Sequence, residues 1–118
     1  FCSHAGLFGT LKGTTKSLLQ LEKEVGLTSF ISDKFKSQQG RFVWGWDTVS
    51  NPQDTLAGIG APKNTFGHLG FTGTSVWIDS DSGKGWLLLT NATKKYWYHR
   101  KGLNELRKSL GAIVWNRL

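Results

Sequence analysis

One histidine, His68, stands among three glycines at every third position, Gly67, Gly70 and Gly73. The surrounding segment, residues 64–79, passes from a polar turn into a β-branched and aromatic run. Glycine is avoided inside strands because it adds no packing and costs backbone entropy. Glycines in such a run indicate that another group comes close to the backbone. With an imidazole beside them, we predict that this segment faces a ligand or a reacting group.

A hydrolytic site also needs a nucleophile, a base within hydrogen-bonding reach and donors for the oxyanion. The sequence has no Ser-x-x-Lys, Gly-x-Ser-x-Gly or His-Glu-x-x-His motif, and no phosphate-cradling glycine loop. Cys2 has only His4 as a local base, and we interpret His4 as structural because no carboxylate or second metal-binding residue stands near it. Asp79-Ser-Asp-Ser-Gly83 lacks the downstream glutamate of a calcium loop, so we interpret it as a turn. We expect no metal and no cofactor, and the chain holds at most half of a site.

The chain of 118 residues is long enough for one ordinary domain. Because it begins with Phe1 and contains no methionine, we expect it to be part of a longer polypeptide. No apolar run approaches the roughly 20 residues that span a bilayer, and one cysteine does not fix the compartment.

The formal charge of +7 is concentrated in the second half of the chain. This excess fits an anionic partner, or a solvated helix face, which we favour. We expect no nucleic-acid partner, since no zinc-finger, RNP or basic heptad pattern is present. The densest positive positions are Lys94, Lys95, Arg100, Lys101, Arg107 and Lys108.

Residues 1–40 are predicted to be mainly helical. The first nine residues form an ordered turn, and Thr10 caps a helix that continues to about Val25 and ends at Gly26. A second, shorter helical or irregular piece covers residues 28–35, and a polar loop follows it. The first helix should bury an apolar stripe made of Leu11, Leu18, Leu21 and Val25.

Residues 41–118 are predicted to form a three-stranded antiparallel sheet covered by a C-terminal helix, which makes the fold class α+β. The strands cover about 41–48, 66–78 and 85–91, and the third should be buried on both faces. A loop at 51–63 separates the first two, and its length is typical of loops near functional sites. Phe42, Trp44 and Trp46 would share one face, either buried or free to stack on a ligand. The helix covers about 98–118, with an apolar stripe made of Leu103, Leu106, Leu110, Ile113 and Val114.

Several segments resemble, in the same order, the C-terminal part of the serine β-lactamase and penicillin-binding-protein superfamily. They are similar to its class C-like branch, which includes esterases and D-Ala-D-Ala peptidases. The resemblance covers nearly the whole chain, and the co-linear set is more specific than any one motif. It rests on Ser3-His-Ala-Gly-Leu-Phe-Gly-Thr10, Gly45-Trp46, Phe66-Gly-His-Leu-Gly-Phe-Thr-Gly-Thr-Ser-Val-Trp-Ile-Asp79 and Leu87-Leu-Leu-Thr-Asn91.

The resemblance implies that residues 1–40 are the tail of a helical subdomain and that residues 41–118 are the C-terminal half of an α/β subdomain. His68-Leu69-Gly70 takes the place of the family's Lys/His-Thr/Ser-Gly strand. By that correspondence His68 would bind or polarise the substrate and help proton transfer, and the Phe71 N–H would be one oxyanion donor. Such a donor contributes roughly 3 kcal/mol to lowering a barrier. Leu69, Gly70 and Thr72 would line the substrate.

The implied function is a fragment of a hydrolase that forms an acyl-enzyme on a β-lactam, a peptide amide or an ester. The fragment would be inactive alone, because the nucleophile-bearing Ser-x-x-Lys is absent. Leu69 replaces the usual Thr or Ser, which favours an esterase, a peptidase or a degenerate member. The alternative is a non-catalytic module that binds peptidoglycan or a protein. The expected partner is the N-terminal half of the same protein, or a second copy joined through an exposed sheet edge. The resemblance also implies a periplasmic or cell-envelope location.

Overall fold

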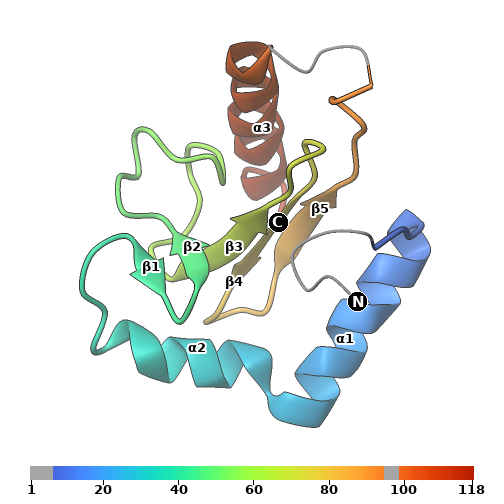
Figure 1. Cartoon of the computed structure of the whole chain (residues 1–118). Helices are drawn as coiled ribbons and strands as arrows, with labels where there is room; N and C mark the ends of the chain where they lie inside the picture. Colours follow the sequence, from blue (N-terminus) through green and yellow to red (C-terminus); the bar gives the residue numbers. More distant parts are fainter. Residues whose placement is uncertain (1–6, 95–98) are drawn as a thin grey trace.

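The computed structural model describes residues 7–94 and 99–118. The predicted turn at residues 1–9 lies mostly outside this part, together with Cys2, His4, Lys95 and the predicted start of the last helix at residue 98. Two helices come first, α1 (Leu11–Val25) and α2 (Leu27–Phe35). Five strands follow, and α3 (Arg100–Trp115) ends the fold (Figure 1). The strands are β1 (Phe42–Val43), β2 (Trp46–Thr48), β3 (Thr65–Leu69), β4 (Ser75–Asp79) and β5 (Gly85–Leu88).

The five strands form one antiparallel meander in the order β1-β2-β3-β4-β5, which confirms the α+β class and corrects the prediction of three strands. The segment 41–48 divides because Trp44 and Gly45 both have positive φ, 47° and 84°. This is the backbone of a two-residue type I′ hairpin turn. The predicted common face of Phe42, Trp44 and Trp46 is therefore wrong, since Trp44 lies at the hairpin tip.

The segment 66–78 also divides, into β3 and β4. The Gly70 N–H donates to the Thr74 carbonyl, the Gly73 N–H donates to the Gly70 carbonyl, and Gly73 has a φ of 97°. A three-residue loop ending in a left-handed glycine is a common hairpin connection. Phe71 and Thr72 have strand propensity, but they form this loop.

The two faces of the sheet are covered by different helices, and each has its own core (Figure 1). Residues paired across antiparallel strands share a face, so Phe66 and Ile78 lie on one side, and Gly67 and Trp77 on the other. On the first side, Phe66 packs with Leu27 and Ile31 of α2. On the second, Trp77 packs with residues of the 49–61 segment and with Trp115 of α3.

The first helix has the predicted ends but not the predicted burial. The Thr10 side chain accepts from the Gly13 N–H, and Gly26 ends the helix with a φ of 58°. None of the residues of α1 is buried, and Leu11 and Val25 are 56% and 59% exposed. The predicted stripe is wrong as a buried face because α2 and α3 cover the sheet, whereas α1 flanks the edge strand β5 (Figure 1).

The last strand is also less buried than predicted. It ends at Leu88, and its residues Trp86, Leu87 and Leu88 are only half-buried. The prediction of burial on both faces is wrong because β5 is the edge of the sheet in the described part of the chain.

Candidate functional site

His68 lies near the end of β3, where the strand's burial changes from buried to exposed. It pairs with Val76 of β4, so its side chain is on the α2 side of the sheet. Its ring atom Nδ1 lies 2.9 Å from the Leu69 carbonyl oxygen. A carbonyl accepts only, so in the neutral imidazole this contact places the proton on Nδ1 and leaves Nε2 as an acceptor. In that tautomer, Nε2 of the exposed ring can accept a hydrogen bond.

The end of β3 at Leu69 extends beyond the residue pairs that β3 forms with its neighbour β2. The pairing between β2 and β3 consists of Asp47 with Gly67 and Thr48 with Phe66, so Leu69 lies beyond it. Backbone groups alternate between the two edges of a strand, and Gly70 already bonds toward β4. The backbone groups of Leu69 therefore point to the edge away from β4, where a substrate main chain could align.

Leu69 lies on the opposite face from His68. It pairs with Ser75, is half-buried, and packs against the core cluster that contains Val49, Ala57 and Trp77. The structure thus brings His68 and Leu69 to one strand end but directs their side chains to different faces. A ligand that reaches both must cross the strand edge.

The three glycines each have a packing reason within the chain. A Cβ on Gly67 would lie 2.1 Å from the Val76 carbonyl oxygen and 2.5 Å from the indole of Trp77. A Cβ on Gly70 would lie 1.8 Å from Thr74 Oγ1, and one on Gly73 would lie 2.2 Å from Thr90 Oγ1. The groups that approach these glycines are therefore neighbouring strands and turns, which accounts for the glycine spacing without a ligand.

Phe71 and Thr72 occupy the tip of the β3–β4 hairpin, and both are exposed. The Arg100 guanidinium lies over the Phe71 ring, 5.9 Å from its centroid. The Thr72 carbonyl accepts from Thr90 Oγ1 at 2.7 Å and from the Ala92 N–H at 2.8 Å. These bonds tie the hairpin tip to the segment after β5 and hold Phe71 at the mouth of a cavity.

Arg107 of α3 fixes the base of the same hairpin. Its Nε donates to Ser75 Oγ at 2.8 Å, and its Nη2 donates to the carbonyls of Thr74 and Gly70 at 3.1 and 3.4 Å. Its Nη1 donates to Asn104 Oδ1 at 3.0 Å. Burial lowers the pKa of the Arg107 guanidinium, and the charge of Arg100 lowers it further. Arg107 is thus a buried cation that positions the β3–β4 hairpin, and it has no carboxylate partner in the described residues.

The burial of Arg107 corrects its assignment to a solvated basic face. It is 5% exposed, whereas the predicted stripe members Leu106 and Ile113 are 44% and 53% exposed. The buried side of α3 follows residues 103, 107, 110, 111 and 114, which have helical spacing. In the sequence, Arg107 lies one helical turn from Leu103 and one from Leu110, and this spacing could have predicted its burial.

A cavity of ≈ 240 Å³ lies between the hairpin and the start of α3. Leu69, Gly70 and Phe71 line its strand side, and Arg100, Leu103 and Arg107 line its helix side. The structure therefore gathers three of the five predicted site residues around one cavity. His68 and Thr72 do not line it.

Residues 7–94 and 99–118 contain neither a metal-binding cluster nor a membrane-spanning helix. There, no group of three or more His, Cys, Asp or Glu side chains could hold a metal ion. Within the same ranges, no helix has the length and apolar character needed to cross a membrane.

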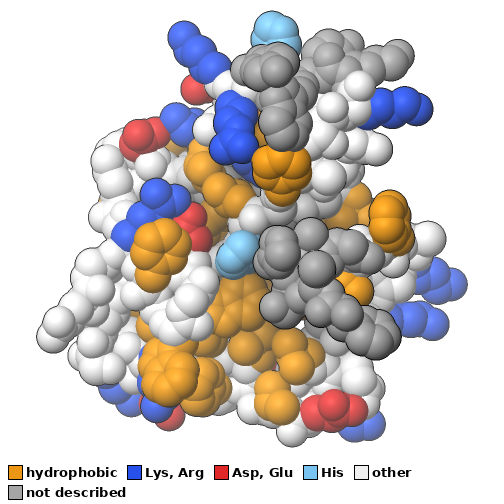
Figure 2. Space-filling view, in the orientation of Figure 1, with side chains coloured by type: hydrophobic (Ala, Val, Ile, Leu, Met, Phe, Trp, Pro, Cys, Tyr) orange, Lys and Arg blue, Asp and Glu red, His pale blue; other side chains and the backbone are white. Residues whose placement is uncertain are grey.

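Hydrophobic side chains gather on the visible face near α2 and the β1–β2 hairpin, with Lys and Arg mainly at its margins (Figure 2).

Comparison with protein-family models, with curated proteins and with solved structures found no match for this chain.

Proposed function

We propose that the β3–β4 hairpin is the substrate-lining wall of a serine hydrolase that acts on an amide or ester through an acyl-enzyme. The main support is the exposed His68 ring, whose Nδ1 lies 2.9 Å from the Leu69 carbonyl oxygen, so that Nε2 is the acceptor in the neutral imidazole. A ring held in this way suits proton transfer to or from a substrate at the strand edge. The sequence resemblance supports the same role for His68.

The nucleophile in this proposal comes from a Ser-x-x-Lys segment outside the 118 residues. The chain supplies His68 and, at the hairpin tip, the Phe71 N–H as an oxyanion donor. Leu69, Gly70 and Thr72 border the substrate. Leu69 packs into the core and offers no hydroxyl, so an uncharged ester or amide suits this wall better than a carboxylated β-lactam.

The test uses the longer polypeptide that contains these residues and a Ser-x-x-Lys segment. Hydrolysis of a p-nitrophenyl ester and of nitrocefin is measured for the native sequence, for His68→Ala and for the surface control Lys63→Ala. We expect His68→Ala to lower the turnover number by about 10²-fold or more and Lys63→Ala to leave it unchanged. Equal activity of native protein and His68→Ala would refute the role of His68.

A non-catalytic binding module is the second candidate, and the packing of the glycines favours it. Since Gly67, Gly70 and Gly73 are needed to accommodate Trp77, Thr74 and Thr90, their presence does not require a substrate. This candidate predicts binding of peptidoglycan or of a protein without any covalent adduct. Labelled penicillin or a fluorophosphonate separates the two, because only the enzyme forms an adduct on the serine.

The proposed partner is the other part of the same fold, or a second copy, bound along β5. Among the strands of residues 7–94 and 99–118, β5 is the last in the sheet order, and α1 lies beside it (Figure 1). Unpaired strand edges recruit further strands. We expect the 118-residue chain to associate at high concentration in light scattering, and a strictly monomeric species would contradict this.

A further inference from the structure

The tip of the β1–β2 hairpin holds a large aromatic side chain in the open. Trp44 is 71% exposed, and its φ of 47° lies in the left-handed region. Asparagine, aspartate and glycine are the usual residues at this position of a type I′ turn, because a bulky side chain adopts a positive φ only at a cost in free energy. Strained residues of this kind are concentrated at functional sites, so the exposed indole is a candidate contact for a partner.

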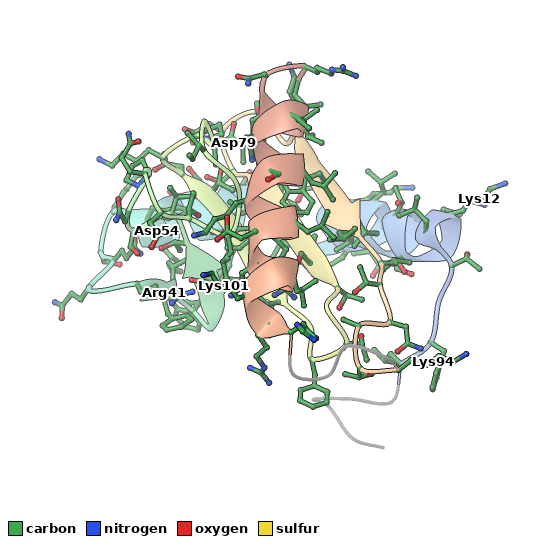
Figure 3. All side chains as sticks on the ribbon, turned by 90° about the horizontal axis from the view of Figure 1, so that it is seen from above. Lys12, Arg41, Asp54, Asp79, Lys94 and Lys101 are labelled. Carbon is green, nitrogen blue, oxygen red and sulfur yellow. The ribbon has the colours of Figure 1, made fainter. Side chains whose placement is uncertain are left out.

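Trp44 forms a patch with two side chains of α2. The ring of Phe30, which is 42% exposed, lies edge-on to the indole, with the ring centroids 5.5 Å apart and an interplanar angle of 77°. The Lys34 ammonium lies 5.1 Å from the centroid of Phe30 and 5.5 Å from that of Trp44. We call Phe30, Lys34 and Trp44 the tip patch. Arg41 lies at the same hairpin, on the opposite side of α3 from Lys12 of α1 (Figure 3).

The shape of the tip patch favours a broad, deformable partner over an enclosed ligand. None of its residues lines the two cavities beside α3. Because the two rings are 77° apart, they cannot both stack on one planar ligand such as a sugar ring or a base. An exposed indole at a hairpin tip can instead insert among the headgroups of a bilayer, where tryptophan is enriched.

The charges around the tip patch have a cationic excess. Asp33 lies 2.9 Å from Lys36, and the buried Asp47 binds the Arg41 guanidinium. Lys34 takes part in none of the ion pairs found among the described residues, so its positive charge is the local excess. The whole chain has a formal net charge of +7. An anionic surface is attracted by this charge, whereas a second copy of the chain is repelled by it.

We propose that the tip patch docks the protein onto an anionic phospholipid surface. Trp44 and Phe30 enter the interfacial layer, and the Lys34 ammonium lies beside the lipid phosphates. A lysine that lies along aromatic rings suits this layer, since its stem covers apolar surface while its charged end reaches the headgroups. Apolar insertion and attraction to anionic lipid both contribute to such binding. This docking is independent of the proposed hydrolase activity.

The test is co-sedimentation of the 118-residue chain at low salt with two kinds of vesicle. One kind contains phosphatidylcholine alone, and the other contains phosphatidylcholine and phosphatidylglycerol in equal parts. We expect binding to the anionic vesicles that weakens with added salt and much weaker binding to the neutral ones. We expect Lys34→Gln to weaken binding to the anionic vesicles by about fivefold and to leave binding to the neutral ones unchanged.

Trp44→Asn is the decisive variant, because it separates binding from folding. Asparagine adopts a positive φ more readily than tryptophan, so we expect urea unfolding to show a more stable chain. We also expect binding to the anionic vesicles to fall by about tenfold, since the indole no longer enters the interfacial layer. A Trp44→Asn chain that binds these vesicles as tightly as the native chain would overturn the proposal.

Phe30→Ser and Phe42→Ser form a matched pair. Phe42 is 58% exposed and has the Arg41 guanidinium 5.4 Å from its ring centroid, but it pairs with Asp47 and so lies on the α3 side of the sheet. We expect Phe30→Ser to weaken vesicle binding severalfold and Phe42→Ser to leave it unchanged. Equal effects of the two substitutions, or no binding of the native chain to anionic vesicles, would overturn the proposal. Self-association without vesicles that Trp44→Asn abolishes would assign the patch to a second copy and overturn it as well.

Discussion

Replacing Arg107 tests whether the candidate wall is held by directed hydrogen bonds or by positive charge. Two of its acceptors, the carbonyls of Thr74 and Gly70, also accept a backbone N–H within the hairpin. Ser75 Oγ, in a residue that is 2% exposed, and the half-buried Asn104 Oδ1 lose the donor that Arg107 supplies when the guanidinium is removed. The loss of Ser75's partner therefore dominates the expected cost.

Arg107→Met keeps most of the apolar stem and removes the charge. An unsatisfied buried hydroxyl costs about 1–3 kcal/mol, and the removal of a buried unpaired cation offsets part of the lost bonds. We expect a loss of about 2 kcal/mol in the free energy of unfolding. Arg107→Lys keeps a buried charge without the planar fork that reaches Ser75 and Thr74, so we expect a loss of about 3 kcal/mol or more.

Urea unfolding of the native chain and the two variants measures these differences, provided that the denaturant slopes agree. Adding Ser75→Ala tests the mechanism, because it removes the hydroxyl that Arg107→Met leaves unsatisfied. We expect a coupling of about 1–2 kcal/mol between the two substitutions. Additive effects, or a lysine variant more stable than the methionine variant, would refute the reasoning.

Two further predictions concern α3 and its charged contacts. A Cβ on Gly111 would lie 2.0 Å from the Ala57 carbonyl oxygen, whereas one on Gly102 meets nothing within 4 Å. In thermal unfolding, Gly111→Ala should lower the free energy of unfolding by about 1–3 kcal/mol, and Gly102→Ala should raise it by about 1 kcal/mol. If both substitutions changed the stability in the same direction, the described packing of these two glycines would be contradicted. The hydrogen bond from Lys108 lowers the pKa of Asp54 below 3.8, and the Lys108 charge adds to this. The ion pair therefore stabilises the fold above about pH 4, and this stabilisation is lost as the pH falls through the lowered pKa of Asp54. The difference in unfolding free energy between native protein and Asp54→Asn should therefore shrink in acid. A constant difference from pH 7 to pH 2 would contradict this.

Local signals predicted the ends of elements well. Thr10 and Gly26 bound α1 as their capping chemistry requires, and Asp79–Gly83 forms the predicted turn, with Asp79 Oδ2 accepting from Ser82. These features depend on a few neighbouring residues and on backbone sterics. They can therefore be predicted without knowledge of the tertiary fold.

The number of strands could not be predicted in the same way. Tryptophan has high strand propensity, but Trp44 adopts a left-handed conformation at a hairpin tip. Phe71 and Thr72 also favour strands, but Gly70 and Gly73 close a turn around them. In both places the hairpin pairing of whole strands overrides the preference of single residues.

The burial of an apolar helix face depends on which other element packs against it. The apolar spacing of α1 predicts a stripe but does not predict what covers it, and in this fold α2 and α3 take both faces of the sheet. For the candidate site, the sequence predicted that His68 lies on a strand, as it does in β3. The burial of Arg107 depends on contacts with Ser75 and Thr74, which lie far from it in the chain.

The most direct test of the central proposal is mass spectrometry after reaction with a fluorophosphonate. The 118-residue chain and the longer polypeptide with a Ser-x-x-Lys segment are treated in parallel. We expect no adduct on the 118-residue chain alone. In the longer polypeptide we expect a single adduct, on the Ser-x-x-Lys serine, which forms more slowly in His68→Ala. An adduct on a residue of the 118-residue chain, or none on either protein, would contradict the central proposal.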